Sequence, residues 1–589
     1  MNQESRNCQN CTQPFVIVPE DFAFYEKIKV PPPTFCPQCR LQRRLAFSNV
    51  FCLYKRPCDL CGKDVVSRYS RDKQYRVYCP QCWWSDKWDA VDYGRPYDFS
   101  RPFFEQFREL WHEVPLLGLS VDLRTAIESP YTNDAGYLRE CYLLFVANHS
   151  ERSLYGYYVT QSRDCADSSF IRECEFSFDL FRAFQIYHGI GIEYSYTCSD
   201  SAFLWQCANC HNCFASANLR NKQYHIFNRP YTREAYLEKI KEYDLGSYKN
   251  YTRLKEEMSR HRLRYPAKVF HHDFSTNTTG LFVYSSKNCK ECFEIEGGEN
   301  CKYTSFILTP TVKDSYDYTS WGENAELVYE AMVVGEGVRN VQFGEETGIG
   351  LYDAYYTKLC TTSSNLFGCI SMRTKSHCIL NKQYSKEEYG DMVRKIIAQM
   401  NEMPYTDAQG RVYRYGEFFP AELSVFGYNE SLAQTYYPLG EEEARQKGYR
   451  WKDAEPSRHT VTFRAQDLPD NIRDTDDSVL KEILGCVSCG KAYRIIPQEM
   501  EFYRKMNVPV PRQCFYCRLD EKMKGQPHPA RLWTRACQCT GQGSENNVYH
   551  NEAGHFHATV HCPNEFQTSY APDRPEIVYC EPCYQAEVV

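Results

Sequence analysis

The chain has 589 residues, which is too many for one hydrophobic core and predicts several structural units. Hydrophobic residues make up 42% of it and charged residues 25%, as in ordinary globular proteins. The net charge of -7 excludes a surface committed throughout to binding polyanions, although local basic patches are compatible with it. No apolar run is long enough to cross a membrane, and the opening "MNQESRNCQNC" has no secretory-signal features, so we expect a cytoplasmic protein.

The composition is unusual in its 31 cysteines, many of which occur in pairs with C-x-x-C spacing. In a small secreted domain such a pattern would indicate disulfides. Without a secretory signal, the spacing indicates metal binding in a reducing compartment. We therefore expect zinc, which takes four soft ligands in closed structural sites.

Residues 1–92 are predicted to form two zinc ribbons in tandem. The expected ligands are Cys8, Cys11, Cys36 and Cys39 in the first ribbon, and Cys58, Cys61, Cys79 and Cys82 in the second. Each C-x-x-C turn supplies two thiolates, and units this small need the metal in order to fold. The 24 residues between the first two pairs are a normal ribbon loop, which favours sequential ribbons over an interleaved cross-brace as in RING domains.

A basic cluster follows the second knuckle of the first ribbon. It comprises Arg40, Arg43 and Arg44, and the next ribbon adds Trp83, Trp84 and Trp88. Guanidinium groups contact phosphates and indole rings stack on bases, so we hypothesise that this module binds single-stranded nucleic acid weakly. The alternative is a solvated basic turn and an apolar seam against the rest of the chain, which the net charge of -7 favours.

Beyond the ribbons, "SRPFFEQFRELW" (100–111) places aromatic side chains at helical spacing and predicts a cap on the first coil of a repeat. In that repeat, Cys141, Cys165 and Cys213 lie on a 24-residue grid, with Gly189 at the empty position. A later stretch repeats at 26 residues. Short β-rich runs with Asn, Asp and Gly at the turns favour the stacked coils of a β-solenoid.

A larger repeat aligns residues 212–236 with 365–389 and predicts two solenoid segments, each closed by a helix. Thr232 and Ser385 are the expected N-caps of these helices. The predicted fold is mainly β and multidomain, with a central two-segment β-solenoid, capping helices and paired zinc ribbons at each end. Its expected parts are tandem zinc ribbons (1–92), a helical cap or linker (93–129), solenoid segment 1 (130–230), a helical insertion (231–265), solenoid segment 2 (266–383), a helix and irregular connector (384–480) and tandem zinc ribbons (481–589).

The last part opens with a second copy of the first ribbon, because residues 8–41 align with 486–519 without a gap. The expected ligands are Cys486, Cys489, Cys514 and Cys517 in the third ribbon, and Cys537, Cys539, Cys580 and Cys583 in the fourth. The fourth departs from the pattern, since one residue separates Cys537 from Cys539 and its insert brings Cys562, His555, His557 and His561. Four closed sites predict about four zinc ions per chain.

The third ribbon, "CVSCGKAYRIIPQEMEFYRKMNVPVPRQCFYCR", resembles the short probable zinc-ribbon family, whose pattern is C-x2-C-x-x-x-F…E-x-x-F-Y…P-x-x-C-x2-C-R. The wider chain resembles uncharacterised zinc-ribbon proteins of the ultrasmall candidate-phyla bacteria, notably in "YGEFFPAELSVFGYNE" (415–430) and "NKQYSKEEY" (381–389). This resemblance covers most of the chain and implies zinc ribbons. It implies no established activity.

Other candidate sites are less specific. Cys207, Cys210 and Cys213 in "CANCHNC" could bind a further metal, but the stacking of small buried cysteines is the simpler interpretation. Charged residues between Arg163 and Glu175 could form a catalytic solenoid face, although turn capping explains them too.

No P-loop, nucleophile elbow or dinucleotide fingerprint occurs in the sequence. The sequence therefore favours a zinc-stabilised, non-enzymatic binding or scaffold protein whose knuckles dock nucleic acid or protein. The alternative is an enzyme that uses the solenoid face on a carbohydrate or another polymer.

Overall fold

The computed structural model of the protein describes residues 2–269, 274–307, 309–455, 459–528 and 530–588. The fold is mainly β and contains the predicted β-solenoid, with cysteine clusters toward both ends of the chain. Within these ranges, every helix is too short or too polar to cross a membrane.

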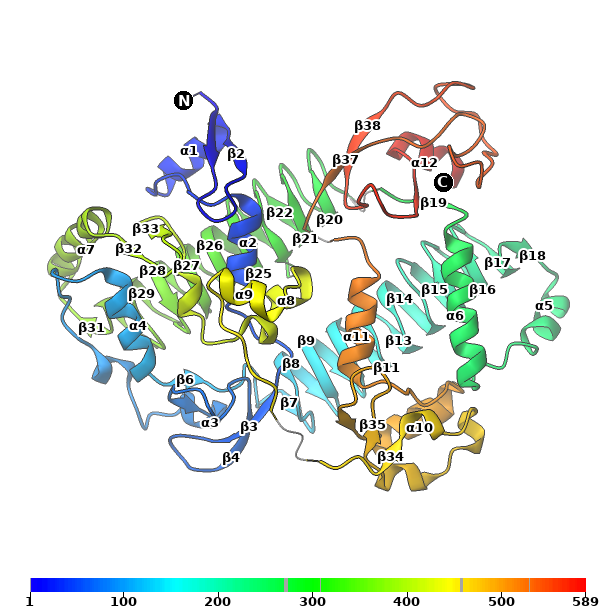
Figure 1. The fold of residues 1–589 in the computed structure, drawn as a ribbon, viewed down its shortest axis with the longest axis horizontal. Coiled ribbons are helices and arrows are strands. Elements are labelled where there is room, and N and C mark those ends of the chain that lie inside the picture. Colours follow the sequence, from blue (N-terminus) through cyan, green and yellow to red (C-terminus); the bar gives the residue numbers. More distant parts are fainter. Residues whose placement is uncertain (1, 270–273, 308, 456–458, 529, 589) are drawn as a thin grey trace. The chain divides into compact units, whose positions relative to one another are not determined.

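The chain forms two compact units, and each combines ribbons with a solenoid that is distant in the sequence (Figure 1). Unit 1 comprises Met1–Leu119, Phe270–Asp453 and His528–Arg531, and therefore joins the N-terminal ribbons to the second solenoid. Unit 2 comprises Ser120–Val269, Ala454–Pro527 and Leu532–Val589, and joins the first solenoid to the C-terminal ribbons. Each ribbon pair therefore packs with a solenoid that is not its neighbour along the chain.

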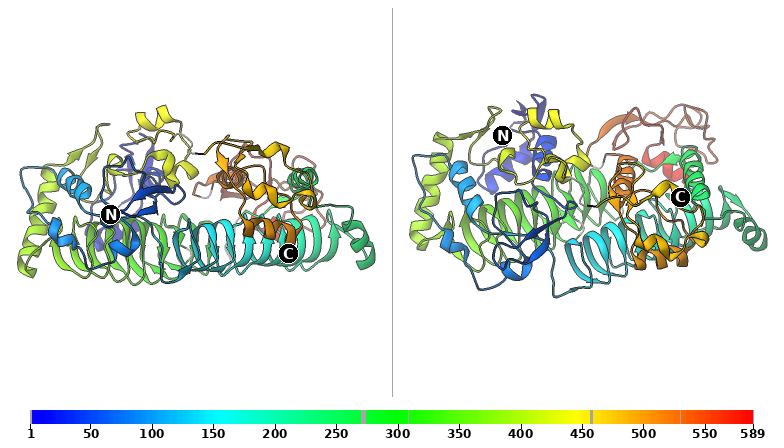
Figure 2. Two further views of the ribbon diagram at one scale, coloured as in Figure 1. Left: turned by 90° about the horizontal axis from the view of Figure 1, so that it is seen from below. Right: turned by 60° about the horizontal axis from the view of Figure 1, so that its bottom comes forward.

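The first solenoid is a sheet of stacked, almost entirely parallel strands, whose successive coils can be followed in Figure 2. Its strands are β7 (Ala126–Ile127), β8 (Asn133–Arg139), β9 (Tyr142–Glu151), β10 (Leu154–Thr160), β11 (Arg163–Ala166), β12 (Ser169–Arg172), β13 (Glu175–Phe178), β14 (Phe181–Ile190), β15 (Tyr196–Trp205), β16 (His211–Ala217), β17 (Gln223–Ile226) and β18 (Arg229–Pro230).

One coil of this solenoid contains 12 residues, as the pairs Tyr142↔Leu154 and Cys165↔Ser177 show. The predicted interval of 24 therefore spans two coils. Ser153, Ser177 and Ser201 also recur at 24 residues, and they alternate with the grid positions in one column, in which Gly189 is followed by Ser201 and then Cys213.

Within each coil the backbone repeats every three residues. Asp164, Asp167 and Phe170 have positive φ angles of 50°, 56° and 55°, a conformation that is uncommon for residues other than glycine. The residue after each of them is buried in the solenoid core. Ser168 illustrates how the ladder is held, since its hydroxyl donates to the Ala166 carbonyl at 2.9 Å and accepts the N–H of Leu180 at 3.1 Å. Such serines satisfy polar groups that the narrow core would otherwise bury unpaired.

Some coils of the second solenoid are longer. The register Gly280↔Cys292 spans 12 residues, and Tyr316↔Tyr329 spans 13. The predicted interval of 26 therefore also spans two coils. Its strands are β20 (Gly280–Tyr284), β21 (Cys292–Glu296), β22 (Gly298–Glu299), β23 (Ser305–Ile307), β24 (Val312–Lys313), β25 (Tyr316–Gly322), β26 (Ala325–Gly335), β27 (Arg339–Gly348), β28 (Tyr352–Lys358), β29 (Ser364–Phe367), β30 (Ser376–Ile379) and β31 (Lys382–Gln383).

Helices follow each solenoid where they were expected. Helices α5 (Arg233–Ile240) and α6 (Tyr248–Arg262) contact the first solenoid, and α7 (Lys386–Glu402) contacts the second. The predicted N-caps are confirmed, because Thr232 Oγ1 accepts from Ala235 N and Ser385 Oγ accepts from Glu388 N, both at 3.2 Å.

The aromatic stripe at residues 100–111 forms helix α4 (Phe103–Glu113), but it does not cap the first coil. The Phe103 ring lies 5.1 Å from Tyr356 and 5.4 Å from Phe367, on the second solenoid. The prediction assumed that this helix packs on the solenoid nearest to it in sequence. It packs instead on the second solenoid, which belongs to the same unit.

The remaining elements belong to the ribbons and connectors. The helices are α1 (Pro19–Lys27), α2 (Pro37–Leu45), α3 (Pro80–Trp83), α8 (Leu432–Tyr436), α9 (Glu441–Gln446), α10 (Pro497–Met506), α11 (Phe515–Lys524) and α12 (Glu581–Val588). The strands are β1 (Glu4–Asn7), β2 (Pro14–Ile17), β3 (Tyr54–Pro57), β4 (Asp64–Ser67), β5 (Val77–Tyr78), β6 (Leu116–Leu117), β19 (Pro266–Ala267), β32 (Tyr405–Thr406), β33 (Val412–Tyr413), β34 (Phe463–Arg464), β35 (Leu484–Gly485), β36 (Ala492–Tyr493), β37 (Trp533–Ala536), β38 (Glu565–Thr568) and β39 (Ile577–Val578).

Candidate metal centres and ribbon docking

The thiols of the first three ribbons come together as sequential ribbons require. The groups are Cys8, Cys11, Cys36 and Cys39; Cys58, Cys61, Cys79 and Cys82; and Cys486, Cys489, Cys514 and Cys517. Within each group all sulfur atoms lie within 4.8 Å of one another. An interleaved cross-brace would have paired the cysteines differently.

Local structure prepares these thiols to act as ligands. Cys36, Cys79 and Cys514 are the N-cap residues of α2, α3 and α11, so each lies at the positive end of a helix dipole. The N–H of Cys514 also donates to Cys486 Sγ at 3.2 Å. Burial opposes ionisation of Cys486, but backbone N–H groups outweigh it and lower the pKa of this thiol to about 7. At Cys486, the thiolate form that a metal needs is therefore favoured.

The spacing of the sulfur atoms fits a tetrahedral metal ion and does not fit disulfides. Cys11 Sγ lies 3.7 Å from Cys36 Sγ, and Cys489 Sγ lies 3.8 Å from Cys514 Sγ. Around one ion with metal–sulfur bonds of about 2.3 Å, tetrahedral geometry separates the sulfurs by about 3.8 Å. A disulfide would need about 2.05 Å. All 31 thiols are free.

The fourth group differs from the prediction. Cys537, Cys562, Cys580 and Cys583 form the tetrad, while Cys539 lies with His555, His557 and Cys583. With only one residue between Cys537 and Cys539, the turn is too short for both thiols to face one point. Cys562 from the insert takes the fourth place. The short spacing and the ligands in the insert were the signals in the sequence.

The basic cluster of the first ribbon is buried, so its three guanidinium groups are not exposed for the predicted contact with nucleic acid. Arg40, Arg43 and Arg44 are 1%, 2% and 0% exposed. Arg40 Nη2 lies 2.8 Å from Asp317 Oδ2, and Arg43 Nη2 lies 3.0 Å from Glu330 Oε2. Arg44 Nη1 contacts both carboxylates, at 3.2 and 3.3 Å. The solenoid carboxylates occupy the guanidinium groups that phosphates would have needed.

The tryptophans of the second ribbon are also mostly unavailable for base stacking. Trp83 and Trp88 are buried beneath the Arg373 guanidinium, whose carbon lies 5.3 and 4.8 Å from their rings. Trp84 alone of the three is exposed.

Unit 2 repeats the ribbon docking at equivalent positions. Arg518, which aligns with Arg40, places Nε 2.6 Å from Asp167 Oδ2. Lys522, which aligns with Arg44, places Nζ 2.6 Å from Asp179 Oδ1, and Lys255 approaches the other oxygen at 2.8 Å. In both units the helix after the second knuckle therefore anchors its ribbon on solenoid carboxylates (α2 and α11 in Figure 1).

The repeated aromatic pair of the ribbons also docks. The ring of Phe24 stacks on Tyr316 with centroids 3.9 Å apart, and Tyr503 packs edge-on against Phe178 at 5.8 Å. The ion pairs are thus enclosed by apolar contacts, which strengthen them by excluding water.

The solenoid cysteines serve as core residues. Cys207, Cys210 and Cys213 are all fully buried, and their thiols lie 3.5 Å from backbone carbonyl oxygens of their own and neighbouring coils. In the described ranges they belong to none of the groups whose geometry fits a metal ion. The stacking interpretation is confirmed.

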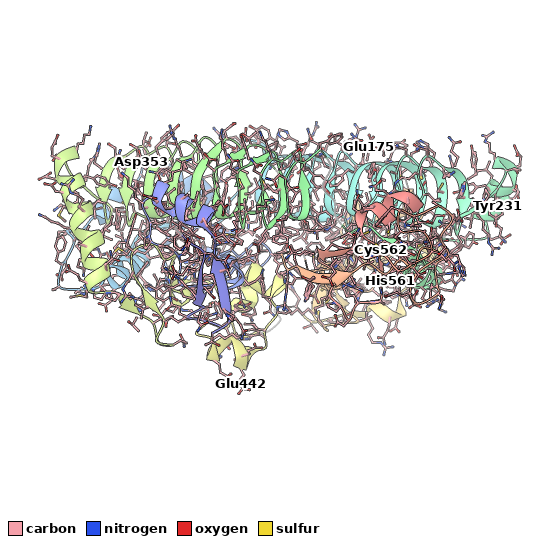
Figure 3. All side chains as sticks on the ribbon, turned by 90° about the horizontal axis from the view of Figure 1, so that it is seen from above. Glu175, Tyr231, Asp353, Glu442, His561 and Cys562 are labelled. Atoms are coloured by element: carbon pink, nitrogen blue, oxygen red, sulfur yellow. The ribbon has the colours of Figure 1, made fainter. Side chains whose placement is uncertain are left out.

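A shallow groove of about 400 Å³ lies on the outer face of the first solenoid. Its polar lining comprises His149, Glu151, Gln161, Ser162, Arg163, Glu173 and Glu175, and Glu175 is marked in Figure 3. Glu175 pairs with Arg163 on the preceding coil, and Arg152 Nη2 lies 2.8 Å from Asp164 Oδ2. The carboxylates are therefore mostly neutralised across coils, as turn-capping residues would be.

No family model and no curated protein matches the chain. Among solved structures, the chain is weakly similar to one described as "putative acetyltransferase from Desulfovibrio desulfuricans G20", at 9% identity and a TM-score of 0.09, over 49% of this chain and 85% of that one. It is also weakly similar to UDP-N-acetylglucosamine acyltransferase from Campylobacter jejuni, at 8% identity and a TM-score of 0.09, over 51% and 100% of the two chains. At these scores neither likeness carries an argument about function.

Proposed function

We propose that the protein is a zinc-stabilised, non-enzymatic scaffold in which the ribbons clamp their own solenoids. The observation that supports this most directly is the double docking of ribbon cations on solenoid carboxylates, through Arg40 and Arg44 in unit 1 and Arg518 and Lys522 in unit 2. A ribbon that used these residues to bind an external partner would expose them.

Zinc is the metal that best suits the cysteine tetrads. Four thiolates in tetrahedral spacing are typical ligands of structural zinc, and zinc undergoes no redox chemistry that would oxidise them. The metal would fix the knuckles from which α2 and α11 begin, because ribbons of this size cannot bury enough apolar surface to fold alone. Removing it should therefore release the docked helices.

The open face of the first solenoid is the surface we propose for a protein partner. Tyr137 and Tyr187 are 57% and 53% exposed there. Tyr137 stacks on the groove residue His149 with ring centroids 4.4 Å apart, and Tyr187 pairs in register with the groove residue Glu175. Exposed tyrosines beside mixed charges are typical of protein interfaces, whereas nucleic acid would need unpaired cations.

The clamp can be tested on the full chain by hydrogen exchange with and without a zinc chelator. We expect the chelator to accelerate exchange in α2 and α11 and in the solenoid strands beneath them, but not in β20 and β21. A matched assay with labelled single-stranded RNA at low salt should show no binding to the metal-loaded protein. Hydrogen exchange that is unchanged by the chelator would contradict the clamp. Salt-dependent RNA binding would instead favour the knuckles as nucleic-acid sites.

The groove supports a second candidate, an enzyme acting on a carbohydrate or another polymer. Glu173 is the carboxylate least engaged in the groove, since Gln185 Nε2 contacts it at 2.9 Å and Arg172 only at 3.8 Å. If the groove is catalytic, Glu173→Gln should lose activity on the polymer. Asp353→Asn is the control, since Asp353 lies on the other solenoid, and it should have no effect. Turnover that is equal in both variants and the unaltered protein would exclude this face as a catalytic site.

A further inference from the structure

The two candidate metal groups of the fourth ribbon share one thiol. Cys583 belongs both to the tetrad with Cys537, Cys562 and Cys580 and to the group with Cys539, His555 and His557. Cys583 Sγ lies 3.7 Å from Cys562 Sγ on one side and 3.2 Å from His557 Nε2 on the other. All ligand atoms within each group lie within 4.8 Å of one another.

The imidazole rings of the second group are held with one nitrogen free for a metal. His555 Nε2 lies 2.8 Å from Glu587 Oε1, and both side chains are fully buried. The other nitrogen, Nδ1, faces Cys539 Sγ at 3.6 Å. His557 Nδ1 lies 2.6 Å from the Val560 carbonyl, so Nε2 faces Cys583. A proton held by an acceptor on one ring nitrogen leaves the lone pair of the other directed at the site, as in metal-binding histidines.

The carboxylate behind His555 is itself anchored. Glu587 Oε2 accepts from the Tyr549 hydroxyl and the Glu552 N–H, both at 2.9 Å, and Oε1 accepts from the Ala553 N–H at 3.2 Å. Asn551 Nδ2 donates to Cys539 Sγ at 3.3 Å. The ligands of the second group are thus supported by a network of hydrogen bonds around Glu587 and Cys539.

We propose that the fourth ribbon holds two zinc ions bridged by the Cys583 thiolate, which gives five zinc ions per chain. The inference rests on the proposed zinc clamp and extends it. Around one zinc, sulfur and imidazole nitrogen ligands are about 3.6 Å apart, close to the spacing observed. Two ions also lower the buried charge, because five thiolates around two divalent ions leave a net charge of about -1, whereas a lone four-thiolate site leaves about -2.

Native mass spectrometry of the full chain, with elemental analysis, tests the number of ions. We expect five zinc ions in the unaltered protein, four in His555→Gln and three in Cys583→Ser, because only the bridging ligand serves two ions. His561→Gln is the matched control, since His561 pairs with the exposed Glu545 and lies outside both groups, and it should keep five (Figure 3). Four ions or fewer in the unaltered protein would overturn the bridged pair, and fewer than two would also overturn the clamp, which needs metal in the first and third ribbons.

Cobalt substitution tests the bridge without altering the chain. Two high-spin cobalt(II) ions joined by one thiolate couple magnetically, so the fully loaded protein should show the spin signal of three isolated ions and a coupled pair. Five independent signals would exclude the shared ligand. Glu587→Gln should keep both ions but weaken the one at His555 by about 10–100-fold against a chelator, the usual effect of losing such a supporting carboxylate. Equal affinity in that variant would refute the assigned role of Glu587.

Discussion

The contact between Arg518 and Asp167 offers the sharpest test of how the ribbons are anchored. Their side chains are only 10% and 7% exposed, and Arg518 Nη1 also donates to the Gln513 carbonyl at 2.6 Å. Burial opposes the charge on Arg518, but Asp167 outweighs it and raises the pKa of the guanidinium further above its usual range. In Arg518→Met the carboxylate would remain buried without its partner.

Breaking such a buried pair costs about 3–5 kcal/mol, because one charge loses its compensation without regaining water. Helix α11 should therefore open at least about 100-fold more often, at about 1.4 kcal/mol for each tenfold change. Hydrogen exchange of the α11 amides in the full chain measures this opening locally, which matters because a chain of two units need not unfold in one step.

Two further variants decide whether the pair itself is responsible. Arg504→Met removes the exposed pair with Asp477, whose side chains are 42% and 71% exposed, and should cost less than about 1 kcal/mol. Adding Asp167→Asn to Arg518→Met should recover about 2 kcal/mol, since the double variant buries no unpaired charge. If the α11 amides are equally protected from hydrogen exchange in Arg518→Met and Arg504→Met, the anchoring role of Arg518 is refuted.

Three other outcomes follow from the structure. Burial lowers the pKa of His261 from 6.5 to about 4. As the pH falls from 6.5 toward 4, the unfolded chain takes up a proton at His261 and the folded chain does not, so up to about 3 kcal/mol of folding stability is lost in this window. The stability of His261→Gln should therefore depend less steeply on pH. An identical pH dependence in the variant and the unaltered protein would contradict the assignment. A Cβ on Gly189 would lie 2.4 Å from Ile186 Cγ2, so Gly189→Ala should destabilise the first solenoid by about 1–3 kcal/mol. Gly390→Ala is the control, because a Cβ there meets open space and should not destabilise the protein. Equal melting temperatures of the two variants would disprove the tight core. After chelation, thiol alkylation mapped by mass spectrometry should modify Cys61 and Cys489 and spare Cys207, Cys210 and Cys213; modification of the last three would contradict their burial.

The sequence alone identified the ligands of three ribbons, because C-x-x-C spacing is a local property that directs two thiols to one point whatever the rest of the chain does. The solenoid was also predictable, since stacked coils repeat side chains at fixed intervals. The coil length was not, because Cys141 and Cys165 alternate with Ser153 in one column, which doubles the apparent period. The three-residue backbone repeat could have been read from the small or aliphatic residues at every third position between Cys141 and Leu219.

Only the tertiary structure decided what the charged residues do. Arg40 and Arg44 looked like a surface cluster because their partners, Asp317 and Glu330, lie more than 270 residues away in sequence. The composition of the two units and the place of α4 depend on the same long-range contacts. The exchange of Cys539 for Cys562 has a related cause, since a thiol from a long insert reaches the site only once the chain has folded back. Local spacing determines which residues can bind a metal, and burial against distant parts of the chain determines which of them remain free to bind anything else.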